Sequence, residues 1–191
     1  MALVGLSVAL MAAGCNSNKG ADKSASSVTP TTTKTEQSPP LEDLLANNPG
    51  VPTGFVPYEG DGYRLLVPTT WSRKSGTSAN NFTLSNNSSL SIAQSGGVVM
   101  EVSIASKSTQ ADIKDLASTL VKGQQNITKL SESFANSGAR IISASYGPSK
   151  SAVTLYVVEL SKQSYLKILV SGAISDPYVK AVVTSVVARA K

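Results

Sequence analysis

Few residue combinations in this sequence are suited to catalysis. The chain has 191 residues, one cysteine and no histidine. The lack of histidine excludes Ser-His-Asp and Cys-His nucleophiles, and also every zinc or iron site that is built on imidazole. Serine is abundant, so a hydrolase that pairs a serine with Lys, Asp or Glu stays open as a hypothesis. No recognised spacing marks such a pair.

Two carboxylates offer a candidate cation site. Glu59 and Asp61 lie in a glycine-containing turn, and hard cations such as calcium prefer carboxylate oxygens. Two carboxylates without a full loop of oxygen ligands make a poor site, so we predict no metal and no cofactor. Asp112 and Asp115 lie at the start of a predicted helix, where carboxylates stabilise the helix dipole, and we assign them that structural role.

The single cysteine follows a short apolar run that ends in small residues. This pattern is typical of a secretory signal and is too short for a membrane-spanning helix. The sequence Leu10-Met11-Ala12-Ala13-Gly14-Cys15 resembles a bacterial lipobox, although Ala12 stands where leucine is usual and no Lys or Arg precedes the run. We therefore predict a signal peptide over residues 1–14, lipidation of Cys15 and anchoring of the exported chain to a membrane. The alternatives are a plain secretory signal, or an N-terminal fragment with an incidental cysteine.

Composition changes after the cysteine. Residues 15–54 are rich in Ser, Thr, Asn, Lys and Pro and contain little to bury, so we predict a flexible linker there. A short amphipathic turn over residues 41–45 is expected to dock locally. The folded domain is predicted over residues 55–191.

The chain is basic, with a formal net charge of +5. The positive charge lies mainly in the predicted domain, where Arg64, Arg73 and Lys74 are close in sequence. We predict that these three form a docking patch for an acidic protein surface or anionic headgroups. The alternative is an ordinary solvated surface. Nucleic acid is not an expected partner, because no module combines aromatic and basic residues in the way such partners require.

Hydrophobic periodicity predicts an α+β domain, with one antiparallel β-sheet packed by helices. The predicted strands cover residues 63–67, 82–84, 90–93, 98–104, 139–146, 152–160 and 164–170, and the last three form an antiparallel meander. One helix is predicted with Thr109 as its cap, Asp112 as the capping-box partner and Gly123 after its end. A final helix begins at Asp176 and continues through Val187, with a strand as the alternative because its valines lower helix propensity.

The segment from Tyr58 to Trp71 resembles the opening of the PsbP family, which are extrinsic proteins of photosystem II on the lumenal side of thylakoids. The shared features are Gly60, Gly62, Tyr63, Arg64, an apolar strand, Pro68 and Trp71. The glycines permit positive φ in a tight turn, Pro68 ends the strand, and Trp71 is expected to cover the edge of the core. Lipobox, spacer and this segment together are similar to the cyanobacterial lipoprotein members. The resemblance implies a PsbP-like α/β/α sandwich.

The resemblance also implies a function. The chain would be a non-enzymatic, membrane-anchored accessory protein that assists the assembly or stability of photosystem II on its oxygen-evolving side. Its partners would be membrane subunits or assembly intermediates, its location the lumenal face of the thylakoid, and its domain monomeric. Histidines proposed as metal ligands in some relatives have no counterpart here. The alternative is a PsbP-like envelope lipoprotein outside photosynthesis, which binds another protein or a small apolar ligand between its sheet and helices.

Overall fold

The structure is a computed structural model of the chain. It describes residues 44, 46, 48, 51–76, 80–87, 97–148, 152–173 and 176–189. The chain divides into Met1–Lys34 and Thr35–Lys191, and every described residue belongs to the second unit. The predicted signal peptide, Cys15 and the predicted strand over residues 90–93 therefore lie outside the described residues. Within the described ranges, no helix is both long and apolar enough to cross a membrane.

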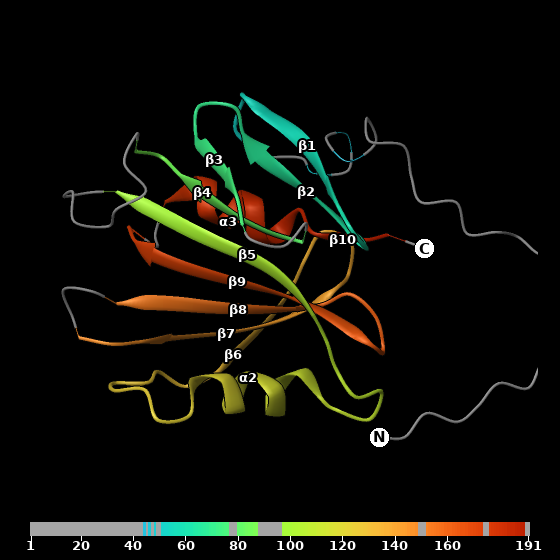
Figure 1. Ribbon diagram of the computed structural model, residues 1–191, viewed down its shortest axis with the longest axis vertical. Helices are drawn as coiled ribbons and strands as arrows, with labels where there is room; N and C mark the ends of the chain where they lie inside the picture. Colours follow the sequence, from blue (N-terminus) through green and yellow to red (C-terminus); the bar gives the residue numbers. More distant parts are fainter. Residues whose placement is uncertain are drawn as a thin grey trace, which may run out of the picture. The chain divides into compact units, whose positions relative to one another are not determined.

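Two antiparallel sheets with helices α2 (Ile113–Val121) and α3 (Pro177–Thr184) make up the described fold, which is α+β as predicted (Figure 1). The large sheet has seven strands in the order β3-β4-β5-β9-β8-β7-β6, and the small sheet has three in the order β1-β2-β10. The strands are β1 (Phe55–Gly60), β2 (Tyr63–Pro68), β3 (Ser72–Ser75), β4 (Asn81–Ser85), β5 (Val98–Ser106), β6 (Ser131–Phe134), β7 (Arg140–Tyr146), β8 (Val153–Glu159), β9 (Ser164–Gly172) and β10 (Val187–Ala188).

Both faces of the large sheet carry packed elements. Helix α2 covers β7 and β8 through the buried residues Ile113, Ala117 and Val121. The opposite face packs in the main core against the small sheet and α3, which Figure 1 shows beside β2 and away from α2. This agrees with an α/β/α arrangement. The prediction of a single sheet is wrong, because Tyr63–Pro68 pairs with β1 and β10 and forms a sheet of its own.

The strand pattern of the second half was predictable. The expected meander is confirmed as β7, β8 and β9, and the expected strands over residues 82–84 and 98–104 are confirmed as β4 and β5. The strands β1, β3, β6 and β10 were not predicted from periodicity. All side chains of β3 and β6 are exposed, so neither strand shows the alternation that marks a half-buried strand.

Both helices begin at an aspartate cap. The Asp176 side chain accepts a hydrogen bond from the Tyr178 N–H at 2.8 Å, as predicted. The Asp112 side chain accepts one from the Lys114 N–H at 2.7 Å and is the N-cap of α2. The prediction of Thr109 as this cap is wrong. The helix begins later, and the Asp112 carboxylate accepts the bond from a free N–H of its first turn, as an N-cap does.

The ends of the helices differ from each other. Gly123 follows α2 with φ +84°, as its predicted position after the helix requires. Helix α3 stops at the buried Ser185, whose hydroxyl accepts a hydrogen bond from the Leu66 N–H at 2.8 Å. Val187 then pairs with Arg64 in β10. The predicted continuation of the helix through Val187 is wrong, because pairing with β2 suits a β-branched residue better than another helical turn.

Part of the predicted linker packs on the domain. Leu44 is only 4% exposed and belongs to the main core. Asn48 is buried, donates a hydrogen bond to the Leu44 carbonyl and accepts one from the Asn136 side chain. Val51 also packs against this core. The expected docking of the turn over residues 41–45 is therefore seen at Leu44, the described residue of that turn.

The two glycines of the hairpin have different roles. Gly62 has φ +85°, as predicted for the turn between β1 and β2. Gly60 is not in the positive-φ region. It lies opposite Tyr63 across the hairpin, and a Cβ at this position would overlap the Tyr63 ring. Tyr63 is 0% exposed, and its burial raises the pKa of the phenol above the usual range. Gly60 is therefore required for space rather than for backbone conformation.

Substitution of Gly60 tests this packing. We expect Gly60→Ala to lower the free energy of unfolding by about 1–3 kcal/mol, because the added methyl group forces the buried ring to move. In a Tyr63→Leu background the same substitution should cost much less, since the atoms it strikes are gone. Urea denaturation of the four proteins measures both costs. Equal costs in the two backgrounds would show that the Tyr63 ring is not the obstacle.

Candidate functional site

The segment that resembles the PsbP opening forms most of the small sheet. Its two halves form the β1–β2 hairpin, and Pro68 is the last residue of β2. Trp71 is 9% exposed and covers the core edge as expected. Its ring stacks on Tyr178 with centroids 6.1 Å apart, and Tyr178 stacks on Phe55 at 5.3 Å. This aromatic column attaches α3 to the hairpin, so the residues that carry the resemblance have structural roles.

The three basic residues of the predicted docking patch do not come together. The Arg73 guanidinium lies over the Tyr58 ring, 5.0 Å from its centroid. The Arg64 side chain is 11% exposed, and its Nη2 lies 3.8 Å from Oε1 of Glu59, on the face of the hairpin opposite Tyr58. Arg73 and Lys74 are successive residues of β3 and therefore project from opposite faces of the large sheet. Their role in docking stays a prediction.

Arginine side chains lie at the candidate cation site. The Glu59 carboxylate contacts two guanidinium groups, those of Arg64 and Arg189. A cation placed beside Glu59 would meet both positive charges, so the geometry does not favour calcium there. Asp61 lies in the β1–β2 turn. In the described part of the chain, no group of three His, Cys, Asp or Glu side chains is placed to hold a metal ion.

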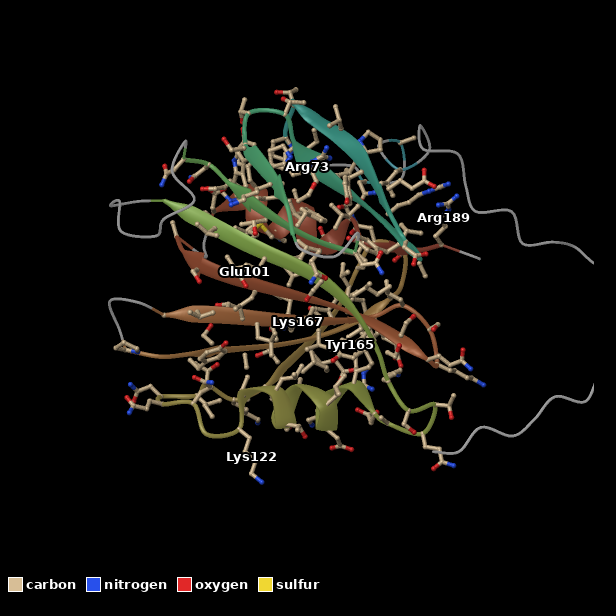
Figure 2. The ribbon with its side chains drawn as sticks, viewed as in Figure 1. Arg73, Glu101, Lys122, Tyr165, Lys167 and Arg189 are labelled. Atoms are coloured by element: carbon tan, nitrogen blue, oxygen red, sulfur yellow. The ribbon has the colours of Figure 1, made fainter. Side chains whose placement is uncertain are left out.

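A cleft of about 560 Å³ opens beside this turn, where the two sheets meet at their strand ends. It is lined by the motif turn, the end of β5, the β8–β9 turn and the C-terminal strand, with polar contributions from Asp61, Ser106, Gln163, Ser164 and Arg189. This is not the pocket between sheet and helices that the sequence suggested for an apolar ligand. Figure 2 shows Arg189 at the C-terminal end of the fold, apart from Arg73. Arg189 was not predicted as a site residue, because the two-residue strand β10 that precedes it has no recognisable sequence pattern.

The serine hydroxyl groups beside this cleft serve a turn. The Ser161 hydroxyl lies 2.9 Å from that of Ser164 and accepts hydrogen bonds from the Gln163 and Ser164 N–H groups at 3.1 Å. This pattern is the local side-chain-to-backbone bonding expected of serine in a tight connection. It gives the hydrolase hypothesis no support at this position.

Arg140 joins three elements, because this β7 residue bonds both β6 and the start of α2. Its Nη1 donates to Oδ2 of Asp112, the α2 cap, at 2.8 Å. Its Nε and Nη2 donate to the two carboxylate oxygens of Glu132 in β6 at 2.6 Å and 3.3 Å. These charge-assisted bonds to Arg140 hold the pKa values of both carboxyl groups below their usual range. Asp112 thus has a second role besides the dipole role predicted from sequence.

Comparisons with known proteins give a likeness in fold without a match in sequence. No family model and no curated protein matches the chain. Among solved structures, the solution structure of cyanobacterial PsbP (CyanoP) from Synechocystis sp. PCC 6803 is similar, with a TM-score of 0.44 and 13% identity. The likeness covers 73% of this chain and 95% of that one. It is too distant to assign a family or an activity.

The Arg140 bonds predict how stability depends on pH. The folded-state pKa values of Asp112 and Glu132 are lower than those of the unfolded chain. Their stabilisation is therefore fully present above the unfolded values of about 4 and is lost as pH falls through the lowered values. We expect Arg140→Gln to reduce the free energy of unfolding most near neutral pH, and progressively less below about pH 4. Urea denaturation of both proteins across this range measures the difference, and a difference that does not change with pH would contradict the assignment.

Proposed function

We propose that this chain is a non-enzymatic accessory protein, anchored to a membrane through Cys15, that docks on the lumenal side of photosystem II and assists its assembly or stability. The observation that carries the proposal is the resemblance of residues 58–71 to the opening of the PsbP family. In support, the marked residues of this segment act together in one hairpin with its aromatic column. That is expected if the resemblance is one of fold.

The surface around the small sheet favours an acidic partner. Arg73, Lys180 and Arg189 are exposed on or near it, and the chain has an overall positive charge. A basic surface steers association with acidic protein surfaces and favours a defined orientation. Arg73 is the strongest candidate among these residues, because its position over the Tyr58 ring orders the cation before binding.

Native fractionation of the source membranes tests the proposal. After gentle solubilisation, we expect the protein to migrate with photosystem II or its assembly intermediates, as located by mass spectrometry. Cys15→Ser should move it from the membrane to the soluble fraction, since each lost methylene of an acyl chain contributes about 0.8 kcal/mol to anchoring. Migration alone, while photosystem II runs elsewhere on the same gel, would refute stable docking. A Cys15→Ser protein that stays on the membrane would remove the anchor from the proposal.

Single substitutions on β3 test the docking role of its cations. Because Arg73 and Lys74 project from opposite faces, one docked surface cannot use both equally. We expect Arg73→Gln to weaken binding to photosystem II membranes on the order of fivefold at low salt, and less at high salt. The matched variant, Lys74→Gln, should change binding by less than about twofold. The reverse order would place the docked face on the Lys74 side of the large sheet.

The cleft beside Asp61 favours a second candidate function, that of an envelope lipoprotein that binds a small ligand. Its lining combines hydroxyl, amide and charged groups with apolar residues such as Ile104 and Leu160. This lining suits a small amphipathic molecule better than a wholly apolar one. Failure of the fractionation test, followed by saturable binding of a small molecule that Ser164→Leu blocks, would support this candidate instead.

A further inference from the structure

Among the described strands, β6 is an edge strand of the large sheet, with no partner strand on its outer side. It pairs with β7 on one side and is the last strand in the sheet order, at the opposite end from β3 (Figure 1). All its side chains are exposed. Phe134 at its end is 61% exposed, and Ile127 just before the strand is 42% exposed. Exposed apolar side chains beside an unpaired strand edge are unusual, because such an edge is a template for pairing with another chain.

The hydrogen bonds just beyond β6 show which backbone groups face outward. The Ala135 N–H donates to the Ala139 carbonyl at 2.8 Å, toward the side of the chain that pairs with β7. The next donor, the Asn136 N–H, bonds the carbonyl of Thr184 at the end of α3, also at 2.8 Å. Successive N–H groups of an extended chain point to opposite sides. Asn136 lies in the turn between β6 and β7, so the alternation is read from the Ala135 bond back into the strand.

The same alternation holds within β6. Ser133 lies opposite Ile141, two residues before Ala135, so its N–H points to the same side as the Ala135 N–H. The Ser133 N–H thus faces β7, and the N–H groups of Glu132 and Phe134 face away from it. The outer edge of β6 is accordingly arranged to receive carbonyl oxygens.

The two edge strands of the large sheet differ in their charged side chains. β3 carries the charges of Arg73 and Lys74, and charged side chains on an edge strand oppose pairing with another chain. β6 carries one charged side chain, Glu132, whose carboxylate pairs with Arg140, a guanidinium that also bonds Asp112. Fewer charged side chains on β6 than on β3 therefore oppose the approach of another strand.

We propose that the outer edge of β6 receives an extended segment of a partner polypeptide. The segment pairs with the outward N–H groups of Glu132 and Phe134 and places an apolar side chain beside the Phe134 ring. Lys129 is exposed next to the strand and favours an acidic residue in the flank of the segment. This inference rests on the proposed function, so the partner segment belongs to a lumenal part of photosystem II.

Two substitutions at one position test backbone pairing. Glu132→Pro removes an outward N–H and leaves the N–H groups that face β7 in place, whereas Glu132→Ala keeps the outward N–H and removes only the side chain. With photosystem II membranes as the probe and the full chain as the ligand, we expect Glu132→Pro to weaken binding at least about tenfold. Glu132→Ala should change binding by less than about threefold, because an exposed ion pair contributes little. Phe134→Ser leaves the backbone intact and should weaken binding several-fold, which keeps the test valid if the proline variant does not fold.

Hydrogen exchange gives an independent readout. In the bound protein, the amides of Glu132 and Phe134 should exchange more slowly, while that of Ser133, already bonded toward β7, should change little. Wild-type binding that survives both Glu132→Pro and Phe134→Ser would overturn the proposal for β6 and leave the docking function intact. No binding of the wild type would refute the docking function and this partner together. Self-association of the chain that Glu132→Pro abolishes, seen by sedimentation, would assign the edge to a second copy and overturn the proposal.

Discussion

The pairing of β5 with β9 is the constraint on which the remaining arrangement depends. These strands are 9 residues long and pair over their whole length, from Val98 opposite Gly172 to Ser106 opposite Ser164. β9 is the last strand of the meander, and β5 is the strand on which β4 and β3 assemble. Their pairing therefore joins two locally formed sheets into one, at a loop-closure cost that only extensive burial repays. Met100, Val102, Ile168 and Val170 on its core face are almost fully buried.

The same pairing determines where the cleft lies. It brings the end of β5 beside the β8–β9 turn, and these form one wall. The other wall comes from the small sheet, which is held through α3. The buried hydroxyl of Ser185 donates to the Val182 carbonyl at 2.9 Å and accepts from the Leu66 N–H at 2.8 Å, so the end of α3 is fixed to the central strand of that sheet. A buried hydroxyl with both bonds made stabilises this junction, whereas loss of the acceptor would leave the Leu66 N–H unsatisfied.

Local signals made much of the fold predictable from sequence, and the rest depends on distant pairing. The meander and the Asp176 cap were predicted because alternation and capping are properties of neighbouring residues. β3 and β6 lie at edges with exposed polar side chains, and β10 consists of two residues, so no pattern marked them. The contacts of the candidate site were the least predictable part of the structure. The contact between Glu59 and Arg189 joins residues from the two ends of the domain, so no local pattern indicates it. Arg73 and Lys74 are adjacent in sequence and suggested one patch, but the alternation of side chains along β3 places them on opposite faces.

The motif residues pack within the fold and are therefore not available to contact a partner. Gly60 accommodates the Tyr63 ring, Pro68 ends β2, and Trp71 stacks in the aromatic column, so these residues are occupied by packing. A partner meets the residues that folding leaves exposed, chiefly the cations near the small sheet and the outer edge of β6. These can change without disturbing the core, because surface substitutions away from special features cost little stability. Two chains can therefore share the motif and the fold and still bind different partners, because the choice of partner depends on these surfaces.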